Sequence, residues 1–189
     1  MYRFDFLAGL LTSGAAALVP ASPAPQPADP LDQCDDNPAL RYDQRIEFKQ
    51  RALDAPDVDL KDYLGKIVLL NFFATWCGPC KAEQPDLQDL YTKYYDAGFR
   101  VIGLNYGETD NTVRRYRDGF HISYPIVMEA ETILHRVQTN SVSNQNIVFP
   151  VSLFLWDNGL LSCYRRGAMG RTELVHKIEG MLKAMHEGT

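Results

Sequence analysis

The sequence has little that would indicate a nucleic-acid-binding or metal-binding protein. Its 19 lysine and arginine residues are outnumbered by 24 aspartate and glutamate residues, which gives a net charge of −5. An acidic chain without a basic run lacks the positive patch that attracts phosphate backbones. None of the four histidines (His121, His135, His176 and His186) lies at a metal-ligand spacing from another. We therefore expect no nucleic-acid partner, no metal and no other cofactor.

A hydrophobic run long enough to span a bilayer is also missing at the N-terminus. The apolar stretch at residues 7–19 has 13 residues, which is too short to cross a membrane comfortably. It follows the basic residue Arg3 and precedes Val19-Pro20-Ala21, a small-residue cleavage site. We expect residues 1–21 to be a secretory signal peptide, with a retained membrane anchor as the alternative. Either segment predicts a periplasmic or other extracytoplasmic location.

Repeats and a second domain are not indicated either. Five of the eleven prolines lie between Pro20 and Pro30, so residues 22–40 are predicted to be an extended linker and N-terminal segment. The remaining residues 41–189 are of ordinary length for one domain. The chain is 46% hydrophobic and 23% charged, as is typical of globular proteins. We expect one folded domain and a monomer.

The most informative stretch is the motif Trp76-Cys77-Gly78-Pro79-Cys80-Lys81, which follows an apolar run at residues 67–73. Helix-forming residues come directly after it, so Cys77 is predicted at a helix N-terminus. The unpaired N–H groups and the helix dipole there favour a thiolate, the form of cysteine that attacks a disulfide. The spacing lets Cys80 lie one turn behind Cys77. The two thiols can therefore interconvert with a disulfide.

Other roles for a Cys-x-x-Cys pair need features that this chain does not show. A zinc site usually has a second ligand pair at short spacing. Covalent haem attachment needs a histidine directly after the second cysteine, where this chain has Lys81. A peroxidase would carry a lone cysteine in a Pro-x-x-x-Thr-x-x-Cys setting. A metal-binding chaperone that uses Cys77 and Cys80 as ligands is the alternative that stays open.

The rest of the chain alternates between strand and helix patterns. The run at residues 67–73 predicts a central strand buried on both faces, and the helix after Cys77 contains Pro85, which should kink it. Asn158-Gly159 favours a tight hairpin turn, and residues 54–57 are predicted to form another turn. Strands are predicted at residues 45–53, 67–73, 99–104, 124–128, 151–156 and 160–165, and helices at residues 60–64, from Cys77 to about 95, 111–118, 132–137 and 173–186.

The motif and this order of elements resemble the thioredoxin superfamily. The motif from Trp76 to Lys81 is identical to that of thioredoxin, whereas Asn71 stands where thioredoxin has a buried acid. The stretch from Asn71 to Pro85 is similar to the extracytoplasmic TlpA/ResA-like branch, with Phe73 where tryptophan is usual. The resemblance implies an α/β thioredoxin fold at residues 41–189. Its central mixed β-sheet would be flanked by helices and carry an additional N-terminal strand.

The resemblance also implies roles for individual residues. Cys77 would be the solvent-facing nucleophile and Cys80 the resolving thiol. Glu83 would be an active-site residue: it lies three residues after Cys80 on the same helix face, where a carboxylate can transfer protons for Cys80 or raise the pKa of the thiols. A solvated surface glutamate is the alternative. The bond before Pro150 would be the cis-proline bond of the family. Contacts with the partner chain would be made by Trp76, Gly78, Pro79, Phe149 and Pro150.

The implied activity is that of an extracytoplasmic thiol:disulfide oxidoreductase. Gly78-Pro79 matches thioredoxin, a reductant, so we expect the chain to reduce the disulfides of specific proteins. Apocytochrome c or copper-site proteins of oxidase assembly are candidate partners. A membrane protein would supply the electrons. The polar residues 139–146, which lead toward Pro150, are expected to contact the partner.

The two remaining cysteines, Cys34 and Cys163, are predicted to form a structural disulfide. Disulfides persist outside the cytoplasm, and an unpaired thiol near a reactive Cys77 would invite wrong exchange. Two buried free thiols are the alternative.

Overall fold

The computed structural model describes residues 34–35, 45–138 and 148–187, with side chains omitted at 136–138. The predicted signal peptide, most of the predicted linker and the predicted partner loop at residues 139–146 lie outside these ranges. Within them, no helix is long and apolar enough to cross a membrane. The elements are β1 (Lys49–Ala52), β2 (Ala55–Asp59), the 3-10 helix η2 (Leu60–Tyr63), β3 (Ile67–Phe73), α1 (Gly78–Tyr94), β4 (Phe99–Asn105), α2 (Asp110–Gly119), β5 (Ile126–Val127), α3 (Glu131–Gln138), β6 (Val151–Leu155), β7 (Leu161–Arg166) and α4 (Arg171–Glu187).

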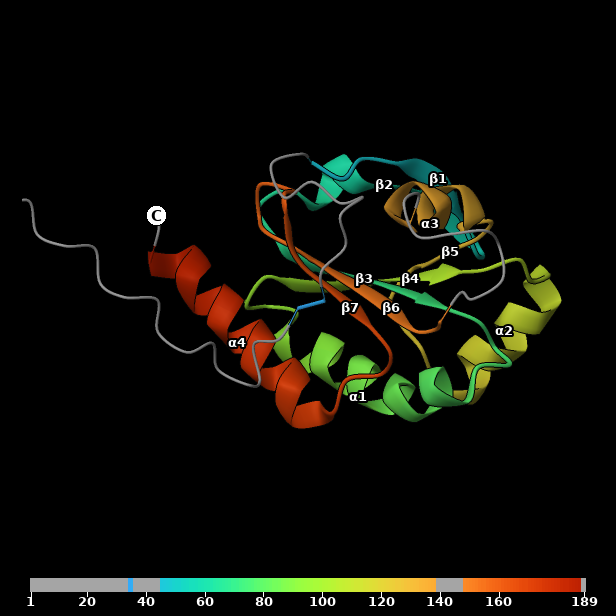
Figure 1. The fold of residues 1–189 in the computed structure, drawn as a ribbon. Coiled ribbons are helices and arrows are strands. Elements are labelled where there is room, and N and C mark those ends of the chain that lie inside the picture. Colours follow the sequence, from blue (N-terminus) through green and yellow to red (C-terminus); the bar gives the residue numbers. More distant parts are fainter. Residues whose placement is uncertain (1–33, 36–44, 139–147, 188–189) are drawn as a thin grey trace, which may run out of the picture.

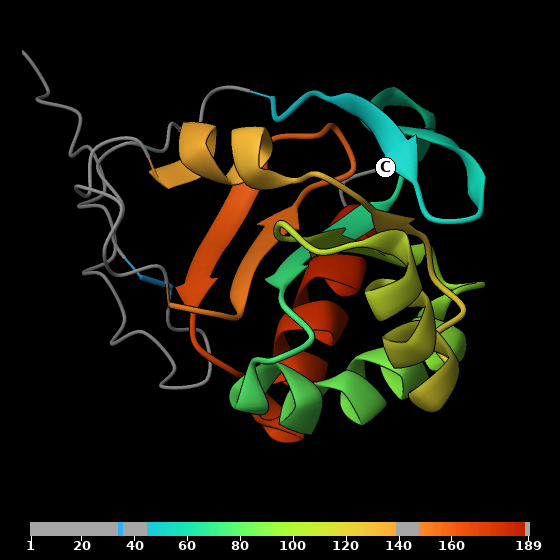
Figure 2. The ribbon, with the colours of Figure 1, turned by 90° about the vertical axis from the view of Figure 1, so that its right-hand side faces the viewer.

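The strands form a mixed seven-stranded sheet in the order β2-β1-β5-β4-β3-β6-β7. Strand β3 runs parallel to β4 and antiparallel to β6, and all seven of its residues are buried. Helices α1 and α4 cover one face of the sheet, and α3 lies on the other (Figures 1 and 2). This arrangement confirms the predicted thioredoxin-like fold, and it places the N-terminus of α1 directly after the central strand.

The N-terminal part of the sheet differs from the sequence prediction. We expected a turn at residues 54–57, but the turn is limited to residues 53–54, and Ala55–Asp59 forms strand β2. Asp54 supplies the tight turn with a φ of 52°. Pro56 is tolerated because β2 is an edge strand, where proline is found in sheets. The chain therefore adds a two-stranded hairpin before β3.

The N-terminal segment is attached to the edge of β7. A disulfide joins Cys34 to Cys163, with 5.4 Å between their Cα atoms. The next residue, Asp35, donates its backbone N–H to the carbonyl oxygen of Tyr164 at 2.7 Å. Its carboxylate accepts the N–H of Arg166 at 2.6 Å. One covalent bond and two hydrogen bonds thus hold this segment against the sheet.

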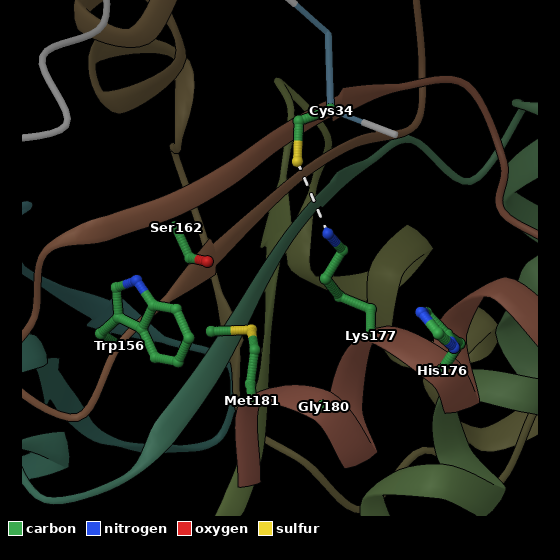
Figure 3. Close-up of a pocket in the computed structure, with 7 residues that line it drawn as sticks. All are labelled: Cys34, Trp156, Ser162, His176, Lys177, Gly180 and Met181. Atoms are coloured by element: carbon green, nitrogen blue, oxygen red, sulfur yellow. Dashed lines mark hydrogen bonds between the residues drawn. The ribbon is translucent and has the colours of Figure 1, made fainter. Parts of the chain in front are cut away.

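A cavity of about 300 Å³ lies beside this disulfide, between the β6–β7 hairpin and α4. Trp156, Ser162 and Met181 contribute to its lining. Figure 3 shows the Lys177 side chain reaching from α4 toward the sulfur of Cys34. The two atoms, Nζ and Sγ, are 3.6 Å apart. The buried ammonium group therefore links α4 to the N-terminal segment.

Candidate active site

The two cysteines of the motif lie at the start of α1. Cys77 is the N-cap residue, and its sulfur accepts the backbone N–H of Cys80 at 3.1 Å. The structure holds the pair as a disulfide, with 5.3 Å between the Cα atoms. An N–H group directed at the sulfur stabilises a thiolate once that bond is reduced. The pair is therefore arranged to alternate between a disulfide and a reactive dithiol.

Cys77 is less accessible than the resemblance implied. Only 4% of the surface of Cys77 is exposed, and only 2% of the surface of Cys80. The neighbouring Gly78 and Pro79 are exposed, and Trp76 has 65% of its surface in contact with solvent. The motif therefore presents Trp76, Gly78 and Pro79 to solvent rather than the sulfur of Cys77.

An aromatic cluster borders the motif. The ring of Phe149 lies edge-on to Trp76, with centroids 5.9 Å apart, and 5.3 Å from the ring of Tyr106. The peptide bond between Phe149 and Pro150 is cis. The sequence did not single out Tyr106, because nothing in its local pattern distinguishes it from a loop residue. Val148 is half exposed beside Phe149, so the described part of this loop presents an apolar surface.

Glu83 is buried beneath the motif, on the inner face of α1. Only 3% of its surface is exposed. One carboxylate oxygen, Oε1, accepts the backbone N–H of Met169 at 2.9 Å, and Oε2 accepts the side-chain amide of Asn71 at 3.2 Å. Burial raises the pKa of Glu83 to about 7, although both hydrogen bonds act to lower it. A carboxyl group of this kind can take up or release a proton near neutral pH.

A second carboxylate, Glu108, holds the turn before the motif. It accepts the backbone N–H of Thr75 at 2.7 Å and the amide of Asn105 at 2.8 Å. The sequence did not identify Glu108, because it lies 33 residues beyond Thr75. Only the parallel register, which pairs Phe73 with Asn105, brings the loop after β4 to this turn. No three His, Cys, Asp or Glu side chains form a potential metal site within the described ranges.

Comparison with known proteins places this geometry in a family. Residues 42–160, more than half of the chain, match the AhpC/TSA family. The chain is 36% identical over 87 residues to a protein from Halalkalibacterium halodurans named thiol-disulfide oxidoreductase ResA. The aligned residues are 46% of this chain and 49% of that protein. The chain thus spans about half the length of that relative. A protein of the same name from Geobacillus thermodenitrificans is 31% identical over 137 residues, which are 71% of this chain and 74% of that one.

A solved structure supports the same assignment. The thiol:disulfide interchange protein of the thioredoxin family from Chlorobium tepidum TLS superposes with a TM-score of 0.64 and 26% identity. The superposition covers 72% of this chain and 93% of that one. The shared fold and the family match lead to one conclusion: the chain belongs to the AhpC/TSA family of the thioredoxin superfamily.

Proposed function

We propose that this protein is an extracytoplasmic thiol:disulfide oxidoreductase that reduces disulfides in specific partner proteins. The observation that carries the proposal is the Cys77–Cys80 pair at the N-terminus of α1, with the Cys80 N–H directed at the sulfur of Cys77. The similarity to proteins named thiol-disulfide oxidoreductase supports it. The presence of a resolving cysteine one turn away favours this reaction over that of a lone peroxidatic cysteine.

The reaction is two successive thiol–disulfide exchanges. The Cys77 thiolate attacks one sulfur of the partner disulfide, so the partner's S–S bond breaks and its other sulfur leaves as a thiolate. The Cys80 thiolate then attacks the sulfur of Cys77 and releases the first partner sulfur. The partner gains two electrons and two protons, and Cys77–Cys80 becomes the disulfide seen in the structure. A membrane dithiol donor is proposed to reduce it again.

Glu83 is proposed to accept the proton of the Cys80 thiol. Cys80 is 2% exposed, so bulk water has little access to its thiol. Glu83 lies one turn further along the same buried face of α1, and its pKa of about 7 allows both protonation states near neutrality. An ionised Glu83 would accept the Cys80 proton before the second exchange. Removing this carboxyl group should slow resolution more than the first attack.

The proposed partners are exported proteins with a reducible cysteine pair, which the exposed Trp76 and Val148 would contact through apolar side chains. Apocytochromes c and copper-site proteins are the first to test. An extracytoplasmic location is supported by the Cys34–Cys163 disulfide, because such bonds persist in oxidising compartments.

Insulin reduction tests the proposal directly. Cys77→Ser should abolish the activity, and Cys80→Ser should accumulate a mixed disulfide with a partner, which mass spectrometry would identify. The control is a variant in which both Cys34 and Cys163 are serine, because it removes a disulfide away from the motif and leaves Cys77 and Cys80 in place; its folded state is checked before the assay. If Cys77→Ser retains most of the activity, the proposal is wrong. Metal titration of the reduced protein tests the chaperone alternative.

A further inference from the structure

Two buried polar residues of the sheet, Asn71 and Ser152, contact the site without taking part in thiol exchange. We propose that they are positioning residues: Asn71 hydrogen-bonds the Glu83 carboxyl group in both its ionised and its protonated form, and Ser152 holds the Asn71 amide. This inference rests on the proposed function, because Glu83 must exchange a proton during the dithiol cycle. It adds a role for an asparagine at the position where thioredoxin has an acid.

The two residues form a cross-strand pair under α1. Asn71 of β3 lies directly opposite Ser152 of β6 in the sheet register, so their side chains share one face. They are 2% and 0% exposed. The Nδ2 atom of Asn71 donates one hydrogen to Oε2 of Glu83 at 3.2 Å and the other to Oγ of Ser152 at 3.1 Å. The Asn71 amide is thus held between Glu83 and Ser152.

The hydrogen-bonding capacity of these groups matches a carboxyl group that changes its charge. An ionised carboxylate can only accept, and the Asn71 amide N–H faces it as a donor. A protonated carboxyl group also donates, and Asn71 can meet it with its carbonyl oxygen by turning the amide over. Ser152 can follow that turn because a hydroxyl group both donates and accepts. Oε2 of Glu83 then keeps a hydrogen bond to Asn71 in both states, and a buried oxygen left unpaired would be destabilising.

The second hydrogen-bond donor to Glu83 lacks this adaptability. The backbone N–H of Met169 can only donate, and so it favours the ionised form. Asp86 of α1 and Glu173 of α4 repel the negative charge of Glu83. The buried hydroxyl groups of Tyr116 and Tyr124 also interact electrostatically with it. Of the two groups that donate hydrogen bonds to Glu83, the Asn71 amide is thus the one that can change its contact with the proton.

The test is a pH titration of Glu83 in which NMR monitors the carboxyl carbon. The oxidised protein is used, so that no cysteine titrates and no turnover is needed. Asn71→Leu keeps the number of side-chain heavy atoms but removes the amide, so both forms of Glu83 lose a hydrogen bond. The ionised form loses the stronger, charge-assisted one, so the midpoint should rise by about one pH unit. Ser152→Ala, a small change that the fold should tolerate, should raise it by less. Asn105→Leu is the matched control, because Asn105 is equally buried but its amide contacts Glu108.

The same variants in the reduced protein provide a second measurement, the pH dependence of Cys77 alkylation. Asn71→Leu should move the midpoint of this curve when Glu83 is present and leave it unchanged in a Glu83→Gln background. The inference is overturned if Asn71→Leu and Ser152→Ala leave the Glu83 titration at its wild-type midpoint. It is also overturned if Asn105→Leu shifts that titration equally. Insulin reduction by the wild-type protein would still support the proposed function in either case.

Discussion

Replacing Glu83 by glutamine should change how the free energy of unfolding depends on pH. The pKa of Glu83 is about 7 in the folded protein, against 4.5 for an unperturbed glutamate. Between these values the folded protein holds a proton that the unfolded chain has released. Each pH unit then lowers stability by about 1.4 kcal/mol. The contribution is fully present below pH 4.5 and is lost by about pH 7, a total of about 3 kcal/mol.

Glutamine cannot titrate, so Glu83→Gln should lack this decline. We expect the variant to gain about 3 kcal/mol relative to wild type between pH 4.5 and pH 8. Urea denaturation of both oxidised proteins across this range measures the difference. Altered hydrogen bonds to Asn71 and Met169 add an offset that is the same at every pH, so only the slope matters. A difference that stays constant from pH 4.5 to pH 8 would falsify the reasoning, because it would mean that Glu83 is already ionised at low pH.

Three further predictions concern other parts of the molecule. Serine at both Cys34 and Cys163 should lower the free energy of unfolding by up to about 5 kcal/mol, because the disulfide closes a separation of 129 residues; chemical denaturation with Cys77–Cys80 left oxidised measures this. Trp76→Ala should slow the reduction of insulin but not that of a small aromatic disulfide. The thermal midpoint should not change, because Trp76 is 65% exposed. Equal effects on both substrates would contradict a contact role. Gly103→Ala should destabilise the fold by about 1–3 kcal/mol, because an added Cβ would lie 3.2 Å from the ring of Phe73; an unchanged denaturation midpoint would show that the ring can move.

The parts of the fold that were predictable depend on local sequence. The buried run of β3, the Cys-Gly-Pro-Cys turn and the helix after it are adjacent in the chain, so their pattern indicated both the elements and their order. Strand β2 was missed because Pro56 resembles a turn residue until the edge position of the strand is known.

The parts of the site that were not predictable depend on sheet register. Glu108 reaches Thr75 only because β3 and β4 pair in parallel and end together. Ser152 meets Asn71 through the antiparallel pairing of β3 with β6. The helical spacing placed Glu83 near Cys80, but the depth of its burial comes from Asn71 below it and from Met169 in the loop before α4.

The attachment of Asp35 to β7 bears on self-association in concentrated solution. The outer strand of an open sheet carries unpaired N–H and C=O groups, onto which a strand of another molecule can add. Here Asp35 occupies the edge at Tyr164 and Arg166, and Arg45 forms a bridge to Leu160 just before β7 begins. The Cys34–Cys163 bond keeps Asp35 in place even when its hydrogen bonds open. By holding Asp35 on the edge of β7, the disulfide therefore also hinders the addition of a strand from another molecule at this position.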